Sequence, residues 1–246
     1  MTTVLQAALN GARSPREHPA IPRTPAELAA AARASVDAGA RTLHLHAYDD
    51  DGRETLDAKA CAETLRAVRA ACPGVPISMT TVEGIAADPA HRLELIARWT
   101  ELPDLVTANM GETGIGELCE HLLGRGVGIE AGVLSVGDAE AFVRSGLAGR
   151  CERVLVEPLD LDPDDAVEHA AAIEAVVTAA GIELEQVHHG DGLASWAVCR
   201  RGLRRGHGIR TGLEDTLVLS DGTRARDNAH LVAHATRLIA ESSAGA

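Results

Sequence analysis

The sequence predicts a single (β/α)₈ barrel over residues 1–246. Short strand-like runs alternate with helical runs along the whole chain, and eight such pairs fill 246 residues without a linker or a break in composition. An open, doubly wound sheet is the alternative, and it commonly carries a glycine-rich phosphate-binding turn after its first strand. Here the first strand leads into Asn10-Gly-Ala-Arg13 and a long loop, which is not that fingerprint. The sequence therefore favours the barrel.

Strands are expected where short runs of β-branched and aliphatic residues are bounded by turn-forming residues. The expected strands are Val4–Asn10, Thr42–Ala47, Pro76–Thr81, Leu105–Met110, Gly128–Leu134, Val154–Pro158, Glu185–His189 and Gly208–Leu213.

Helices are expected after each strand, because start and stop signals bracket the intervening runs. Thr24-Pro25-Ala-Glu27 has the pattern of a capping box with proline at the first helical position, and aspartates precede Pro89 and Pro163. Glycines such as Gly39 and Gly181 fall just past helix ends. The expected helices are Pro25–Ala38, Ala58–Ala71, Pro89–Trp99, Ile115–Leu123, Asp138–Ser145, Pro163–Ala180, Leu193–Arg205 and Ala225–Ser242.

Charge and composition exclude several classes of protein. A net charge of −13 opposes contact with the phosphate backbone, so no nucleic-acid partner is expected. No signal peptide and no apolar run long enough to span a membrane is visible, so no membrane partner is expected either. The five cysteines are odd in number and form no Cys-x-x-Cys motif, which is typical of reduced thiols in a cytoplasmic protein.

Polar residues gather at the carboxyl ends of the expected strands, which in a barrel open on one mouth where the chemistry takes place. The opposite ends, such as Val4, Val75 and Val127, are apolar or plain. The polar ends are Asn10, His44, His46, Thr80, Thr81, Thr107, Asn109, Glu130, Glu157, His188, His189, Arg210, Glu214 and Asp215. We therefore expect the functional site at this mouth.

His44 and His46 are the most informative of these residues. Leu43 and Leu45 alternate with them, so a strand places both imidazoles on one face. Two imidazoles at positions i and i+2 can bind one first-row metal ion such as Zn²⁺. The alternative is a pair of polar residues at a strand end.

The last strand offers a third ligand. Arg210 and Glu214 share a face if the strand stays extended, so Glu214 can complete a His₂Glu set that leaves a fourth metal position open, as in catalytic zinc sites. Asp215 is then placed to move a proton, and Arg210 to hold an anion or stabilise an enolate. A surface ion pair between Arg210 and one of the two acids is the alternative, and spacing alone leaves both open.

Several stretches together resemble the β-keto acid cleavage enzymes, whose founding activity is the cleavage of 3-keto-5-aminohexanoate. These stretches are Asn10-Gly-Ala12, His18-Pro-Ala-Ile-Pro22 with Thr24-Pro25, Leu43-His-Leu-His46, Asp51-Gly-Arg53, Thr107-Ala-Asn-Met-Gly111, and Gly212-Leu-Glu-Asp215 with Asn228-Ala229. The resemblance runs from the first strand to the last helix.

The resemblance implies a (β/α)₈ barrel that uses a divalent metal, usually zinc, to condense a β-keto acid with acetyl-CoA, giving acetoacetate and a new acyl-CoA. It also implies a homo-oligomer, such as a tetramer. The residues that match the family's site are His44, His46 and Glu214 as metal ligands, Asp215 as the proton-transfer carboxylate with Arg210 as its partner, and Thr107, Asn109 and Thr80 near the substrate, Thr80 standing where the family has serine.

Three departures point to an altered substrate pocket. Arg13 stands where the founding enzyme has a glutamate that recognises the substrate amino group, and Tyr48 where the family often has arginine. His188 and His189 replace a run of small residues at the seventh strand end. Because an arginine repels a cationic tail, 3-keto-5-aminohexanoate is expected to be a poor substrate, and neutral or anionic β-keto acids to do better.

Two other functions remain open: a metal-dependent aldolase or lyase that works without CoA, and a metal-binding barrel without catalysis. Arg200, Arg201, Arg204 and Arg205 could meet CoA phosphates, but their helical spacing and their place far from the mouth favour a solvated basic stripe.

Overall fold

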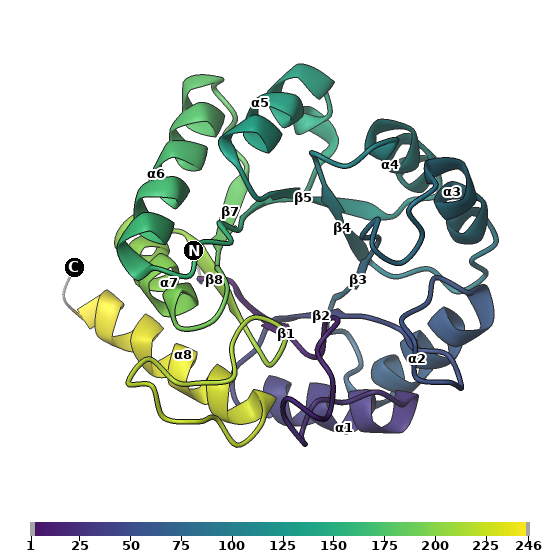
Figure 1. The fold of residues 1–246 in the computed structure, drawn as a ribbon, viewed down its shortest axis with the longest axis horizontal. Helices are drawn as coiled ribbons and strands as arrows, with labels where there is room; N and C mark the ends of the chain where they lie inside the picture. Colours follow the sequence, from purple (N-terminus) through teal and green to yellow (C-terminus); the bar gives the residue numbers. More distant parts are fainter. Residues whose placement is uncertain (1–2, 245–246) are drawn as a thin grey trace.

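The computed structural model describes residues 3–244, and over this range eight parallel strands form a closed barrel surrounded by helices (Figure 1). Each strand pairs with the next one along the chain, and β8 pairs with β1. This closed sequential order confirms the predicted barrel. Residues 1–2 and 245–246 lie outside the described range, and the expectation of one domain over residues 1–246 stays a prediction.

The strands are β1 (Leu5–Ala8), β2 (Thr42–Leu45), β3 (Ile77–Thr80), β4 (Leu105–Asn109), β5 (Gly128–Val133), β6 (Arg153–Val156), β7 (Glu185–His188) and β8 (Gly208–Thr211). The helices are α1 (Pro25–Asp37), α2 (Ala58–Ala71), α3 (Pro89–Ala97), α4 (Ile115–Gly124), α5 (Val136–Ser145), α6 (Pro163–Ala179), α7 (Ala194–Arg204) and α8 (Asn228–Ala244), with a short 3-10 helix at Ala148–Arg150.

Two expected boundaries are wrong for a physical reason. β8 ends at Thr211 rather than at Leu213, because the backbone turns at Gly212. The last helix begins at Asn228 rather than at Ala225, since the chain before it doubles back and Ala225 N donates to Leu217 O at 2.9 Å.

The predicted helix caps are present. The Thr24 hydroxyl accepts from Glu27 N at 3.2 Å, and the Glu27 carboxylate accepts from Thr24 N at 3.0 Å, which is a complete capping box. Asp88 and Asp162 likewise accept from the first free backbone amides of α3 and α6. Each cap satisfies amides that the helix cannot pair by itself.

Alternation along the strands divides the molecule into an apolar layer and a polar interior. Leu43 and Leu45 of β2 belong to the apolar core between barrel and helices, and both are completely buried. Inside the barrel, Gln6 of β1 donates to Glu130 Oε1 of β5 at 2.9 Å, and Ser78 of β3 donates to Glu130 Oε2. A buried network of hydrogen bonds inside the barrel therefore supports the mouth, which is formed by the carboxyl ends of the strands.

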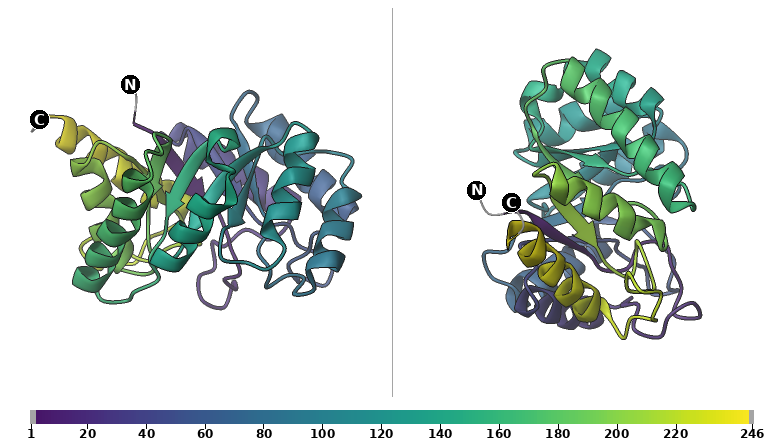
Figure 2. Two further views of the ribbon diagram at one scale, coloured as in Figure 1. Left: turned by 90° about the horizontal axis from the view of Figure 1, so that it is seen from above. Right: turned by 90° about the vertical axis from the view of Figure 1, so that its left-hand side faces the viewer.

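The start of β1 and the end of α8 lie on one side of the barrel, while the long loop between β1 and α1 lies on the other, with the carboxyl ends of the strands (Figure 2). Within residues 3–244, none of the helices has the length and apolar character needed to span a membrane.

We expect Gly212→Ala to destabilise the protein, because an added Cβ would lie 1.8 Å from the Ala8 carbonyl oxygen and force the ends of β8 and β1 apart. Overpacking of this kind costs about 1–3 kcal/mol in the free energy of unfolding, measurable by chemical denaturation. Gly116→Ala is the matched control, since nothing lies within 4 Å of its added carbon. Equal stability of the two variants would contradict this account.

Candidate active site

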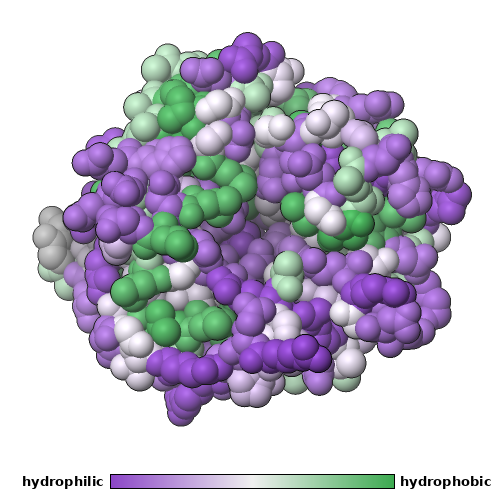
Figure 3. All heavy atoms as spheres, in the orientation of Figure 1, coloured by the Kyte–Doolittle hydropathy of each residue, from purple (hydrophilic) through white to green (hydrophobic). Residues whose placement is uncertain are grey.

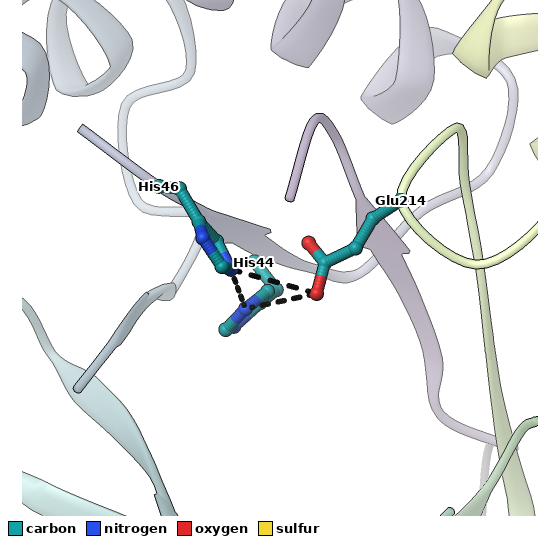
Figure 4. A group of neighbouring side chains, drawn as sticks. All are labelled: His44, His46 and Glu214. Atoms are coloured by element: carbon teal, nitrogen blue, oxygen red, sulfur yellow. Dashed lines mark hydrogen bonds and ion pairs between the residues drawn. The ribbon is translucent and has the colours of Figure 1, made fainter. Parts of the chain in front are cut away.

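His44 and His46 project from β2 toward Glu214 at the mouth of the barrel (Figure 4). The Nε2 atoms of the two histidines are 3.3 Å apart, and each lies 3.5 Å from Glu214 Oε1. Two ligand atoms of a tetrahedral site with bonds of about 2.0–2.1 Å are separated by about 3.4 Å. Glu214 Oε2 is buried and has no hydrogen-bond partner among the described residues. The three side chains thus fit one divalent ion.

Glu214 reaches this position by a turn, so the condition under which Glu214 would share a face with Arg210, a strand that stays extended, is not met. The amides of Asp215 and Thr216 both donate to Gly212 O at 3.0 Å, which coils the chain directly after β8. Gly11 packs against the turn with φ +56, and a Cβ there would lie 2.4 Å from Glu214 Cγ. The turn brings two consecutive acids to the mouth, where a strand would bring only one.

Hydrogen bonds behind the histidines orient their rings. His46 Nδ1 lies 2.5 Å from Glu54 Oε1, and His44 Nδ1 lies 3.2 Å from Thr107 Oγ1, whose hydroxyl donates to Glu130 at 3.3 Å. If each Nδ1 carries the proton, both Nε2 lone pairs face Glu214, the arrangement in which a second layer of residues fixes metal ligands. Glu54 was not among the predicted residues, since it lies in a loop without a pattern.

The two histidines differ in protonation. Burial, reinforced by Arg210 against the opposing charge of Glu214, lowers the pKa of His44 to about 3, so this imidazole is neutral. For His46, burial is outweighed by Glu214 and Glu54, which raise its pKa to about 9. A bound ion would take the place of the proton on His46.

Arg210 and Asp215 form a buried pair, which excludes the alternative of a surface ion pair. Both side chains are 2% exposed, and Arg210 Nη2 lies 2.7 Å from Asp215 Oδ1 and 2.6 Å from Glu214 Oε1. Burial raises the pKa of Asp215 to about 6, although Arg210 opposes the rise. Near neutral pH the Asp215 carboxylate is therefore ionised and a stronger base than an exposed aspartate.

A cavity of about 490 Å³ opens above these residues, and the space-filling view shows a hollow with a hydrophilic floor at this place (Figure 3). Thr80, Thr107 and Asn109, expected near the substrate, all line it. The remaining lining residues are Gly11, Ala12, His44, His46, Glu54, Val82, Gly84, Leu134, Glu157, Leu159, Arg210 and Glu214.

Arg13 lies beside the cavity and forms hydrogen bonds with residues of two other loops. Its Nη2 is 2.6 Å from Asp191 Oδ1, and its Nε donates to the Glu214 carbonyl oxygen at 2.8 Å. The guanidinium thereby joins the loop after β1 to the loop after β7. Tyr48 packs under the Arg23 guanidinium, 3.9 Å from ring centroid to Cζ.

His188 and His189 point to different sides of β7. His189 is completely buried at the mouth, 3.7 Å from Asp215 Oδ1. His188 faces outward and stacks on His207, so of the two only His189 lies beside the cavity residues.

A second group of potential ligands, Glu174, His188 and His207, lies outside the barrel. The two rings are stacked with 4.7 Å between centroids and 4° between planes, so their in-plane lone pairs do not converge on one ion. Arg201 and Arg205 pair with Glu174 at 2.6 and 2.9 Å. This group is therefore an ion-pair network. Arg201 and Arg205, which were expected to lie in a solvated basic stripe, belong to it.

Comparison with known proteins gives one family over nearly the whole chain: the family model described as beta-keto acid cleavage enzyme matches residues 2–245. A 3-keto-5-aminohexanoate cleavage enzyme of Fusobacterium nucleatum is 28% identical over 97% of this chain and 91% of its own length. A 3-oxoadipate:acetyl-CoA acetyltransferase of Cupriavidus necator is 25% identical over 92% of this chain and 84% of its own.

Among solved structures, the ternary complex of ObcA with C4-CoA adduct and oxalate is similar, with a TM-score of 0.72 and 17% identity. The match covers 92% of this chain and 64% of that chain. A likeness at this identity supports the fold alone.

We expect His46→Ala to abolish tight binding of a divalent ion, because two ligands remain where three converged. Metal content after dialysis, measured by elemental analysis, should fall below about one tenth of an equivalent. His91→Ala is the control, because it changes an exposed histidine of α3, and it should keep the wild-type metal content. Full metal content in His46→Ala would place the ion elsewhere.

Glu54→Gln should weaken metal binding without abolishing it, since the ring of His46 loses a charged hydrogen-bond partner but keeps its ligand atom. Loss of such a partner typically costs about 10–100-fold in affinity, which competition with a chelator can measure. An unchanged affinity would mean that the short contact between Glu54 and His46 does not support the ligand.

Proposed function

The chain belongs to the beta-keto acid cleavage enzyme family, and from this premise we propose that its mouth exchanges a carbon–carbon bond between a β-keto acid and acetyl-CoA. The products would be acetoacetate and a new acyl-CoA. The observation that carries the proposal is that a potential metal site, His44, His46 and Glu214, lines the same cavity as Arg210, which is paired with the buried Asp215.

His44, His46 and Glu214 would hold the ion, and we propose zinc because two imidazoles and one carboxylate leave a fourth position for substrate. When bound, zinc supplies Lewis-acid polarisation of the oxygens of the keto acid. Assembly as a homo-oligomer such as a tetramer and a cytoplasmic location belong to the same proposal. The five free cysteines, all buried, are consistent with the location.

Asp215 would act as the base. It removes a proton from C2 of the keto acid, and the resulting carbanion attacks the thioester carbon of acetyl-CoA and expels the thiolate. The thiolate attacks the original keto carbon, the bond between that carbon and C2 breaks, and the proton returns from Asp215 to C2 of acetoacetate. Arg210 holds the Asp215 carboxylate and places a positive charge beside the developing anion.

Thr80, Thr107 and Asn109 would bind the substrate. All three line the cavity, and Thr107 also touches His44 Nδ1, so its hydroxyl is partly committed to orienting the ring. Thr80 Oγ1 accepts from Val82 N at 3.2 Å and can still donate its hydroxyl hydrogen. Asn109 Nδ2 donates to Glu112 Oε1 at 2.9 Å, while its amide oxygen can still accept.

A screen of β-keto acids with the zinc-loaded protein and acetyl-CoA, reading out acetoacetate, tests the function. Turnover that requires acetyl-CoA is expected. Cleavage without acetyl-CoA would favour a metal-dependent aldolase or lyase, and zinc binding without turnover of any keto acid would favour a non-catalytic barrel.

Asp215→Asn should retain zinc but lose most turnover, because it removes the proton acceptor with little change of shape. We expect kcat to fall by about 10²–10⁴-fold. Asp165→Asn, an exposed position in the first turn of α6, controls for the substitution itself and should behave as wild type. If Asp215→Asn kept a normal kcat, the base would have to be another group.

Arg13 is proposed to disfavour a cationic substrate tail. Wild type should prefer a neutral or dicarboxylic β-keto acid over 3-keto-5-aminohexanoate by kcat/KM, and Arg13→Glu should shift the ratio toward the amino compound by about tenfold or more. Arg13→Gln breaks the same contact to Asp191 without adding a negative charge. The idea fails if Arg13→Gln shifts the ratio as far as Arg13→Glu does.

A further inference from the structure

His189 is a buried polar side chain whose ring nitrogens have no hydrogen-bond partner among the described residues. Its exposed fraction is 0%. Nδ1 lies 3.7 Å from Asp215 Oδ1 and Nε2 lies 3.5 Å from Glu157 Oε2, so each nitrogen faces a carboxyl group just beyond hydrogen-bond length. An unpaired buried donor or acceptor is costly, whereas movements of well under 1 Å in the two carboxyl groups would bring both within hydrogen-bond length of the ring nitrogens.

The protons can be assigned from what each partner offers. Burial and the nearby Arg210 guanidinium hold the pKa of His189 well below its usual value, so the ring is neutral, with one donor and one acceptor. The Asp215 carboxylate, already paired with Arg210, can only accept, which puts the ring proton on Nδ1. Nε2 is then an acceptor and needs a donor.

Glu157 can supply that donor. Its side chain is only one-fifth exposed, at the edge of the cavity. Burial, opposed by Arg210 and reinforced by Asp215 and Glu214, raises the pKa of Glu157 to about 7. Asp191 adds to the same effect. A protonated Glu157 donates, as Nε2 requires.

We propose that Glu157 and His189 are positioning residues for Asp215, linked in a chain in which the Glu157 hydroxyl donates to Nε2 and Nδ1–H donates to Asp215 Oδ1. The role in catalysis rests on the proposed function. The order of protons in the chain does not depend on it.

The chain selects which oxygen of Asp215 acts as the base. Oδ1 is the atom nearest to Arg210 Nη2, at 2.7 Å, and the atom that His189 faces. Within residues 3–244, Oδ2 has one hydrogen-bond contact, at 3.3 Å from Arg210 Nε. With Oδ1 held from two sides, Oδ2 is the oxygen left to receive the substrate proton.

The tautomer of His189 can be measured without any turnover. In zinc-loaded protein with ¹⁵N-labelled histidine at about pH 6.5, the signals that disappear in His189→Asn belong to His189 and should show a protonated Nδ1. Glu157→Leu removes the donor to Nε2 and leaves Asp215 in place, so the proton should stay on Nδ1 while the Nε2 signal moves toward that of an acceptor without a hydrogen bond. A protonated Nε2 in wild type, or an unchanged Nε2 signal in Glu157→Leu, overturns the proposal even if no substrate is found.

Kinetics then tests the positioning role. His189→Leu should lower kcat about 10–100-fold while KM and zinc content stay within about threefold, since a misplaced base slows proton transfer but not binding. His189→Asn keeps an amide donor near the place of Nδ1, and Glu157→Gln keeps a donor toward Nε2. Each should have a kcat at least about fivefold above that of the matching leucine variant.

His188→Asn is the control for general packing, because it replaces the neighbouring buried histidine, which faces away from the mouth. It should lower thermal stability and leave kcat of the folded fraction unchanged. Equal kcat losses in His188→Asn and His189→Leu would reduce the effect to general packing and contradict the proposal.

Discussion

The site depends on the way one guanidinium lies between two acids. Arg210 Nη2 lies 2.6 Å from Glu214 Oε1 and 2.7 Å from Asp215 Oδ1, and the Arg210 side chain is 2% exposed. One cation cannot neutralise two carboxylates, and without a bound ion the second positive charge is the proton that His46 keeps, because Glu214 and Glu54 raise its pKa to about 9. An uncompensated charge removed from water is costly. The imbalance favours a further cation next to Glu214, at the place where His44 and His46 present their Nε2 atoms.

The order and type of the elements could be predicted from local patterns, because most helix and strand boundaries are set by residues close to them in the sequence. The capping box at Thr24 and Glu27 begins α1 where expected, and alternating Leu43 and Leu45 fix which face of β2 is apolar. The errors occur where tertiary contacts decide. Gly212 ends β8 because the chain must pass close to Ala8, and that proximity is invisible to a pattern confined to one strand.

The candidate site could be predicted in part. Strand parity places His44 and His46 together, and the resemblance to the family adds Glu214, although the turn that brings Glu214 in is not the extended strand that parity assumes. Supporting groups such as Glu54 and the pairing of Glu157 with His189 depend on how separate loops and strands meet. The sequence shows Arg13 only as a positive charge. Its ion pair with Asp191, 178 residues further along the chain, could not be anticipated.

The closure of the barrel by pairing of β1 with β8 bears on the order of events during synthesis. His44 and His46 are synthesised well before Glu214 and Asp215, and the turn that carries these two acids packs against Gly11, in the loop after β1. A nascent chain can therefore present its two imidazoles long before the third ligand exists. If these residues hold the proposed ion, stable loading must follow closure of the barrel, and an ion captured earlier by the histidines alone would be held loosely enough to exchange.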